Sequence, residues 1–203
     1  MKKSQLKTDE YADFYATYIN TVTEEFTLTE ELEISVHRLV KFVREIPMDK
    51  FDYRYAEGKW TIKDILQHLI DAERIFAYRA LRFARNDKTE LPGFEENDYV
   101  DEARANSRSI QDLLTELLVV RQATLTLFKT FNEEELLRKG IASNKPMSVR
   151  ALGFTIIGHQ NHHQCQSTSG STAPCISLYA PYVLRFLSRA YRLAENVAEY
   201  HFE

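Results

Sequence analysis

The sequence predicts an all-α protein, in which four main helices form a bundle around one core. Apolar residues recur at helical spacing in four long segments, at 29–46, 61–85, 107–131 and 148–164. No segment alternates apolar and polar residues over the length of a strand, and none shows hairpin turn chemistry. Two of the connections are long, which indicates crossover loops between helices rather than a simple up-down-up-down order.

The bulk composition is that of one soluble domain. The chain has 203 residues, of which 44% are apolar and 28% charged, and its formal net charge is −4. This charge argues against nucleic-acid binding as the main function, because phosphate neutralisation needs clustered Lys and Arg. No apolar run approaches the ~20 residues that cross a bilayer, and residues 4–10 supply no apolar core of a signal peptide. We therefore expect a cytoplasmic protein that acts on a small molecule, without nucleic-acid or membrane partners.

The first 22 residues carry a stripe of aromatic side chains, at positions 11, 14, 15 and 18. This spacing is helical, so we expect a short arm that packs over the domain. The segment 29–46 follows, and Pro47 ends it because proline cannot continue a helix.

The segment 61–85 begins with a strong helix signal. Thr61 is a good N-cap, and Asp64 lies in the first turn, where the helix dipole favours a carboxylate. Trp60 precedes the cap and can pack onto Ile65 as a hydrophobic staple.

Residues 86–106 are expected to form a loop, which is long for a simple connector. Such loops are often lids or binding loops, so this one is expected to shape a substrate mouth. The segment 107–131 is the third long helix. A short helical piece then runs from Asn132 to Gly140, and residues 144–146 form a turn.

The segment 148–164 carries the main functional signal. Its inner, apolar face ends in His159 and His163, which lie four residues apart and about 6 Å along the helix axis. Two ring nitrogens can converge on one cation from this spacing. A third ligand must come from another helix. The inward-facing His68 is the best candidate, although a lone inward histidine is usually structural.

Three neutral imidazoles would leave one or more positions open on a divalent cation, whereas a closed structural zinc site has four protein ligands. The pattern therefore favours a reactive site, in which the metal lowers the pKa of a bound water or stabilises a thiolate. Zinc, nickel, iron and copper all suit imidazole ligands.

Three residues beside the histidines are candidates for supporting roles. Asp71 lies within side-chain reach of His68, and it either orients that imidazole or is an ordinary solvated charge. Asp71 or Glu73 could also serve as the general base of a hydrolase. His162 is off the ligand face, so it either supports the ligands or is exposed.

Two separated motifs resemble the signatures of a known family. The first runs from Gly58 to Arg74, and the second begins at 148–152 and continues through the histidines of 158–163. The runs 79–85 and 91–94 fit the same pattern. Because these motifs occur in the right order, the chain resembles the DinB/YfiT-like metalloenzymes over roughly residues 10–164.

The resemblance implies a DinB-like four-helix bundle domain, which we place at 1–165, with a three-histidine metal site. Matched by position, the ligands would be His68, His159 and His163, and the cation would be zinc or nickel. Characterised relatives are similar to metal-dependent S-transferases that use a low-molecular-weight thiol, and dimers are common in the family. We therefore expect a thiol S-transferase, and the resemblance also suggests a homodimer.

Two alternatives remain beside the transferase. One is a metal-dependent hydrolase with bound water as the nucleophile. The other is a non-catalytic stress or interaction protein whose histidines are vestigial. Arg121 and Arg150 would either bind an acidic thiol cofactor or form structural ion pairs, and we favour the ion pairs.

The chain departs from the family at its end, which we assign to an atypical C-terminal extension at 166–203. A stretch rich in Ser, Thr and Gly leads into an amphipathic pattern from 178 to 200. Either the reading frame is altered near the end of the gene, or an additional helix docks on the bundle or on a partner. In both cases we expect weaker bracing of His163.

Overall fold

The computed structural model describes residues 1–54 and 56–164, so the extension expected at 166–203 lies outside the described residues. Four long helices form the bundle: α2 (Leu28–Arg44), α3 (Ile62–Ala84), α5 (Ile110–Lys129) and α7 (Val149–Gln164). The shorter elements are α1 (Asp13–Ile19), α4 (Glu96–Ala103), α6 (Glu133–Leu137), strands β1 (Lys139–Ala142) and β2 (Lys145–Ser148), and 3-10 turns at Lys3–Gln5, Thr8–Glu10, Met48–Lys50 and Ala105–Ser107. The predicted all-α class and its four main helices are confirmed.

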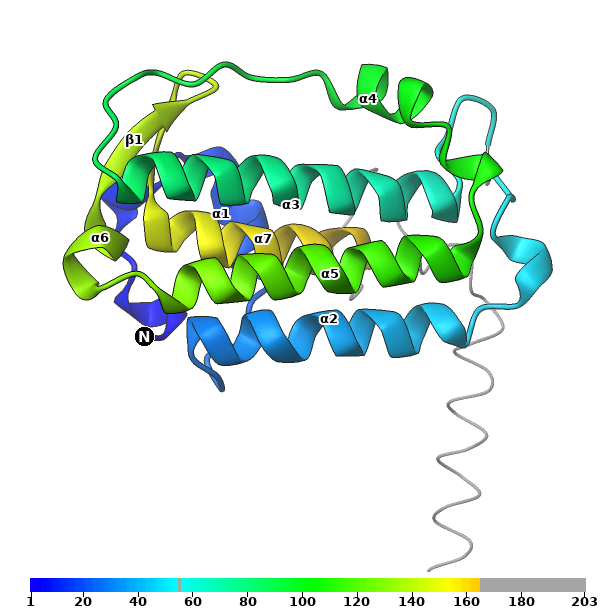
Figure 1. The fold of residues 1–203 in the computed structure, drawn as a ribbon, viewed down its shortest axis with the longest axis horizontal. Coiled ribbons are helices and arrows are strands. Elements are labelled where there is room, and N and C mark those ends of the chain that lie inside the picture. Colours follow the sequence, from blue (N-terminus) through cyan, green and yellow to red (C-terminus); the bar gives the residue numbers. More distant parts are fainter. Residues whose placement is uncertain (55, 165–203) are drawn as a thin grey trace, which may run out of the picture.

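The long helices pack in the cyclic order α2, α5, α3, α7. Figure 1 shows that α3 and α5 run in the same direction, so the segment between them returns along the length of the bundle. That returning segment carries α4. The crossover connection that the sequence predicted is therefore present, and it lies over the helix that carries His68.

Side-chain caps fix where the two histidine-bearing helices begin. Thr61 Oγ1 accepts a hydrogen bond from the backbone N–H of Asp64 at 3.1 Å, and Asp64 Oδ2 accepts one from the backbone N–H of Thr61 at 2.9 Å. Ser148 Oγ accepts from the backbone N–H of Ala151 at 3.1 Å and donates to Glu10 at 2.8 Å. These caps satisfy N–H groups that have no partner within the helix, which confirms the predicted start at Thr61.

The prediction that no strand forms was wrong. Residues 139–142 and 145–148 pair as an antiparallel hairpin. The two turn residues, Ser143 and Asn144, have φ values of 53° and 59°, the left-handed conformation that two-residue hairpin turns use and that Asn tolerates. The strands are short and contain Gly140 and Pro146, so the sequence has no two-residue alternation to reveal them.

The segment 86–106, which the sequence predicted to be a long loop, is not a loop throughout. It contains α4, and Leu91 pairs with Ala142 beside the hairpin. Arg79 of α3 donates to the carbonyl oxygen of Pro92 at 2.9 Å and to Ser143 Oγ at 3.1 Å. These contacts hold the first half of the crossover segment against the hairpin and the end of α3.

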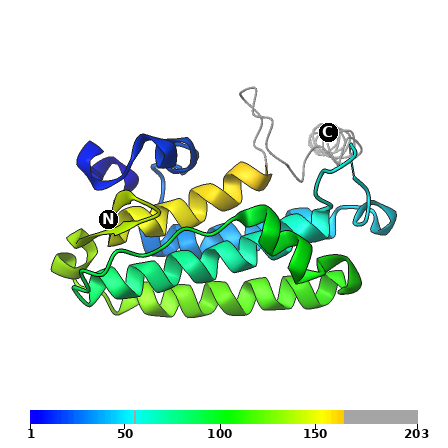
Figure 2. The same ribbon diagram turned by 90° about the horizontal axis from the view of Figure 1, so that it is seen from above.

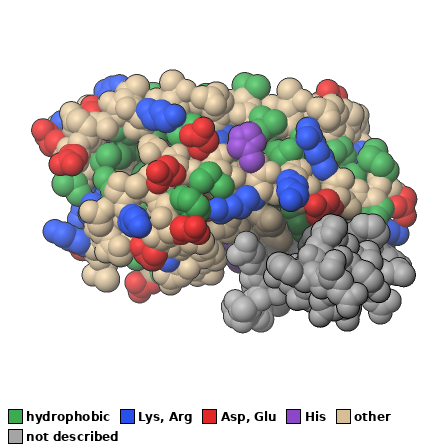
Figure 3. All heavy atoms as spheres, turned by 90° about the horizontal axis from the view of Figure 1, so that it is seen from below, with side chains coloured by type: hydrophobic (Ala, Val, Ile, Leu, Met, Phe, Trp, Pro, Cys, Tyr) green, Lys and Arg blue, Asp and Glu red, His purple; other side chains and the backbone are tan. Residues whose placement is uncertain are grey.

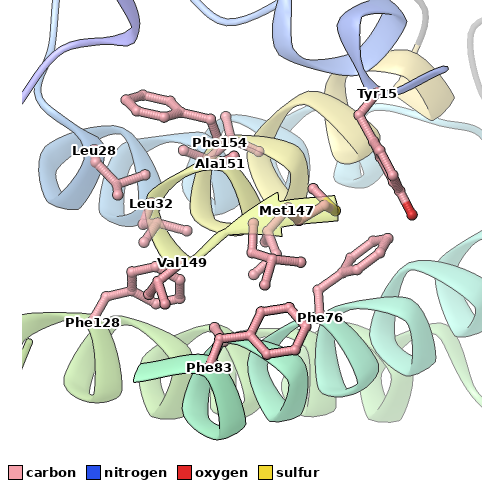
Figure 4. Packing of buried hydrophobic residues seen from close by; sticks show 14 of the residues in the cluster. Tyr15, Leu28, Leu32, Phe76, Phe83, Phe128, Met147, Val149, Ala151 and Phe154 are labelled. Atoms are coloured by element: carbon pink, nitrogen blue, oxygen red, sulfur yellow. The ribbon is translucent and has the colours of Figure 1, made fainter. Parts of the chain in front are cut away.

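The hydrophobic core divides into two clusters along the bundle axis. One lies at the hairpin end and the other around the start of α3. Figure 4 shows the first cluster, in which aromatic rings of α3, α5 and α7 meet the hairpin and α2; its labelled residues are Tyr15, Leu28, Leu32, Phe76, Phe83, Phe128, Met147, Val149, Ala151 and Phe154. Buried polar residues from all four long helices lie between the two clusters: Ser35, Glu73, Arg121 and Gln160.

The aromatic stripe near the N-terminus forms the packing arm that the sequence predicted. It folds into α1, with Tyr15 and Ile19 buried, and packs on the outer side of α7 (Figure 2). A Cβ atom on Gly158 would lie 2.1 Å from the carbonyl oxygen of Tyr18. The close approach of α1 to α7 therefore requires glycine at this position.

The surface carries charges of both signs. Figure 3 shows acidic and basic side chains interspersed on the face that includes α2. Within residues 1–54 and 56–164, no helix combines the length and apolar character needed to span a bilayer.

Candidate metal site

Three histidine rings from two helices meet in one buried cluster. Nε2 of His68 lies 3.0 Å from Nε2 of His159, and Nε2 of His163 lies 3.2 Å from the same atom. Each of the three residues is at most 5% exposed. The structure therefore brings together the three residues that the sequence selected as ligands, although 91 positions separate the first two.

The spacing of the nitrogens fits a single cation. Two ligand nitrogens at 2.0–2.1 Å from a tetrahedral zinc ion lie about 3.3 Å apart. The separations of 3.0 and 3.2 Å around His159 are close to that value. One ligand atom from each ring lies within 4.8 Å of the other two. Among the described residues, these three histidines are the group found with a spacing that could hold a metal ion.

The surroundings of the rings favour their neutral forms. Burial lowers the pKa of His68 to about 3, with a further contribution from neighbouring His163. Burial, followed by the other imidazoles, lowers the pKa of His159 well below its ordinary value. Because only a neutral imidazole offers a lone pair to a metal, the fold keeps these ligands ready for a cation at neutral pH.

Aromatic side chains enclose the cluster. The ring of Trp60 lies 4.9 Å from the ring of His68, and the ring of Phe76 lies 5.8 Å from that of His159. The ring of Tyr18 lies 5.2 Å from that of His159 in an edge-on arrangement. These walls restrict the rotation of the histidine rings and exclude bulk water. The predicted staple residue Trp60 therefore belongs to the site, a role that its sequence context did not indicate.

One side of the cluster opens to a cleft of about 180 Å³. Its lining comes from α1, the turn before α3, α4 and the end of α7: Tyr18, Gly58, Lys59, Trp60, Glu96, Asn97, His162 and His163. Burial, together with the nearby Glu95 carboxylate, raises the pKa of Glu96. Burial also raises the pKa of Tyr18 to about 12. Sequence patterns did not select Glu96 or Tyr18, because only the folded chain brings α1 and α4 to the end of α7.

Arg121 lies next to the cluster but in a closed network of hydrogen bonds. Its Nε and Nη2 donate to the two carboxylate oxygens of Glu73 at 2.8 and 3.0 Å. Its remaining N–H groups donate to the carbonyl oxygen of Leu32 at 3.0 Å, Ser35 Oγ at 2.8 Å and Gln160 Oε1 at 2.9 Å. All five guanidinium N–H groups thus have protein acceptors, and none is left for an acidic cofactor.

Arg150 forms a second buried ion pair, at the hairpin end of the bundle. Its Nε donates to Glu10 Oε2 at 2.6 Å, and its Nη2 donates to Glu10 Oε1. The pair ties the N-terminal segment to the first turn of α7, far along that helix from His159.

The two remaining candidates lie at the margin of the site. Asp71 accepts a hydrogen bond from Gln67 at 3.1 Å and lies 3.6 Å from Arg74. Burial raises its pKa, with opposing contributions from these partners. His162 is half-buried, and its ring lies 5.3 Å from that of His163 and 5.2 Å from that of Tyr18. It therefore lines the cleft rather than the buried cluster.

Comparisons with known proteins found matches to the part of the chain that forms the bundle. A family model described as the DinB superfamily matches residues 31–167. A protein from Geobacillus thermodenitrificans, designated “Putative metal-dependent hydrolase”, is 30% identical over 117 residues, which are 57% of this chain and 66% of that protein. A protein from Bacillus mycoides with the same designation is 24% identical over an alignment of 165 residues, and the match covers 75% of this chain and 90% of that protein.

One solved structure shares the fold. YfiT from Bacillus subtilis, described as a probable metal-dependent hydrolase with an unusual four-helix bundle topology, gives a TM-score of 0.57 at 17% identity. The match covers 70% of this chain and 87% of YfiT. The chain spans less than two thirds of the length of two curated relatives, namely 66% of the Geobacillus protein and 42% of one from Bacillus cereus.

Proposed function

The chain belongs to the DinB superfamily, and we propose that it is a metal-dependent hydrolase that acts on a small polar substrate. The observation that carries the proposal is the convergence of three buried Nε2 atoms beside an open cleft. The designations of its relatives support the same reaction class.

The donor set determines what a cation at this site can do. His68, His159 and His163 would hold it through neutral nitrogens, and no carboxylate belongs to the cluster found among the described residues. A divalent cation bound in this way keeps its full positive charge, lowers the pKa of a water ligand and polarises a substrate carbonyl. The rings of Trp60 and Phe76 keep competing solvent away from the three nitrogens.

We assign proton transfer to a carboxylate that lines the cleft, rather than to the buried carboxylate of Glu73. Both oxygens of Glu73 already accept hydrogen bonds from Arg121, so Glu73 is a poor candidate for the general base. Glu96 lines the cleft, and its raised pKa makes its carboxylate a stronger base than that of an ordinary glutamate. We assign to Glu96 the role of general base. Its carboxylate would accept the proton of a nucleophile in the cleft.

The size of the cleft favours hydrolysis over thiol transfer. Its 180 Å³ is less than the roughly 300–1,000 Å³ of pockets that hold drug-sized ligands. A transferase would need room for both a low-molecular-weight thiol and its acceptor, whereas a hydrolase needs one substrate and water. Thiol transfer is the second candidate, because a cation held by neutral ligands also stabilises a thiolate.

Elemental analysis of the purified protein tests the metal site. We expect about one zinc or nickel per wild-type chain and a complete loss of that metal in His68→Ala. The matched control is His37→Ala, because His37 is exposed on α2 and outside the cluster. Equal metal content in all three proteins would contradict the proposal.

Activity assays on the metal-loaded protein separate the reaction classes. The proposal predicts turnover in a panel of small esters and amides, and lower turnover in Glu96→Gln. Conjugation of small thiols to an electrophile, with no hydrolysis, would establish the transferase instead. A wild-type protein that takes up no metal and shows no thermal shift with Zn²⁺ or Ni²⁺ would favour the non-catalytic alternative.

A further inference from the structure

A small cavity is lined by buried residues of both the histidine cluster and the Glu73–Arg121 ion pair. Its volume of about 10 Å³ is room for about one water molecule. Four polar side chains and four apolar ones line it: Glu73, Arg121, His159 and Gln160, with Leu69, Phe76, Leu117 and Ile156. A buried water typically needs two to four polar partners, and this lining supplies them.

His159 has one ring nitrogen that does not face the other two histidines of the cluster. Its Nε2 is directed at the Nε2 atoms of His68 and His163, so Nδ1 is the nitrogen left for another partner. A ligand histidine usually donates its second N–H to a carboxylate, a carbonyl or a water, which fixes its tautomer and orientation. The water-sized cavity that His159 lines is also lined by a carboxylate, that of Glu73.

Glu73 can accept a further hydrogen bond at this position. Each of its oxygens receives one bond from Arg121, and an ionised carboxylate has about four lone-pair sites. Arg121 is 2% exposed and is held by acceptors on α2, α3 and α7. The guanidinium therefore fixes the carboxylate relative to three neighbouring helices, and the carboxylate cannot turn away from the cavity without breaking this network.

We infer that Glu73 is a positioning residue for the metal site, and that it acts through a water in this cavity. The water accepts a hydrogen bond from Nδ1–H of His159 and donates one to the Glu73 carboxylate. This arrangement keeps the proton of His159 on Nδ1 and the lone pair of Nε2 directed at the cation. The inference rests on the proposed function, because it requires the three histidines to bind a metal.

The test compares two buried ion pairs of the same type. Glu73→Gln removes the carboxylate beside the cavity, and Glu10→Gln makes the same change in the pair with Arg150, which is remote from the cluster. Zinc affinity is measured by competition with a chelator, and the ligand field by the visible spectrum of the Co²⁺-substituted protein. We expect Glu73→Gln to lose about 10- to 100-fold in zinc affinity and to change the Co²⁺ spectrum. Glu10→Gln should match wild type in both measurements.

A second pair of variants covers the case in which Glu73→Gln does not fold. Glu73→Leu/Arg121→Met and Glu10→Leu/Arg150→Met remove both charges of each pair, so neither leaves a buried charge without a partner. Only Glu73→Leu/Arg121→Met should lose zinc affinity, because only this pair lies beside the cavity. Wild-type affinity and spectrum in the Glu73 variants would overturn the inference and leave the proposed function intact. Absence of metal binding by the wild-type protein would overturn both, so the two failures are distinguishable.

Discussion

The two buried Glu–Arg pairs of this bundle share their chemistry and differ in their neighbours. Glu10–Arg150 lies at the hairpin end, where Glu10 also accepts a hydrogen bond from Ser148, the residue that caps α7. Glu73–Arg121 lies in the polar layer between the two hydrophobic clusters, next to the cavity shared with His159. The first pair secures the N-terminal arm, and the second connects the middle of the bundle to the metal site. An ion pair's role is thus set by what its carboxylate can reach.

The largest expected effect is the loss of stability when each carboxylate is neutralised. Glu73→Gln should cost about 3–5 kcal/mol, because it leaves the fully enclosed Arg121 without its counter-charge. Glu10→Gln should cost less, since Arg150 is 7% exposed and water can reach it more easily. Urea unfolding of both variants measures the difference. Equal losses of stability in the two variants would contradict the expected effect of the deeper burial of Arg121.

Gly158→Ala probes the arm from the side of α7. The added methyl group would meet the carbonyl oxygen of Tyr18 at 2.1 Å, so α1 must shift, at a cost of about 1–3 kcal/mol. Because Tyr18 also lines the cleft, the variant should change metal affinity as well as stability. Gly93→Ala is the control, since the nearest atom to its new methyl group would be the side-chain oxygen of Ser143, at 3.1 Å. A thermal melt of both variants distinguishes a required glycine from a tolerated one.

The pH dependence of stability distinguishes the metal site from the hairpin end, because histidines titrate in the first and Glu10 titrates in the second. The pKa of His68 is about 3 in the folded, metal-free protein, against its ordinary value of 6.5. The unfolded chain therefore binds more protons between these values, and stability falls as pH falls, by up to about 1.4 kcal/mol per pH unit for each such proton. We expect the melting temperature of the apo protein to decrease from pH 6.5 to 5 and the decrease to be smaller in His68→Gln.

Glu10 contributes in a lower pH range. Burial raises its pKa, but hydrogen bonds from Arg150, the backbone of Lys7 and Ser148 outweigh burial, so its pKa is below the ordinary 4.5. Its contribution is present above pH 4.5 and is lost as pH falls through the folded-state pKa. A Glu10→Gln protein should therefore keep the wild-type slope between pH 6.5 and 5. A flattened slope in that range would contradict the assignment to the histidines.

The smallest expected effect is at the hairpin turn. Asn144 has a φ of 59°, and alanine in that conformation should cost about 1 kcal/mol. Urea unfolding of Asn144→Ala measures this cost, and zinc affinity should be unchanged because the turn is remote from the cluster. A change in affinity would mean that the hairpin end and the metal site are coupled.

Local patterns predicted the elements that depend on one helix alone. The four long helices, the cap at Thr61 and the shared face of His159 and His163 follow from spacing within a helix. The choice of His68 followed from its inward position and from the family resemblance. The hairpin was missed because its two-residue turn has serine at a left-handed position, which is not a recognised turn signal.

The parts of the site that come from three or more segments could not be predicted from sequence. Nothing within the sequence around Glu73 indicates that both its oxygens bind Arg121, 48 positions away. The same holds for Tyr18 and Glu96, which share the cleft although one precedes and the other follows the helix of His68. Periodicity within one segment shows which face of that helix is buried, but it does not show which other segments that face meets.

The histidine pKa values also revise the expected pH at which metal is lost. If the ligands had the pKa of free imidazole, release of the metal would begin as pH falls toward about 6.5. With the folded-state pKa of His68 at about 3, proton competition should begin at a lower pH. Metal content after dialysis at a series of pH values measures the shift.

The central claim is that three imidazoles from α3 and α7 bind one cation. The most direct measurement is anomalous diffraction from crystals of the zinc- or nickel-loaded protein. The claim predicts a single anomalous peak about 2.0–2.1 Å from Nε2 of each of His68, His159 and His163. No peak among the three rings, or a cation bound with the His68 ring turned away, would contradict it.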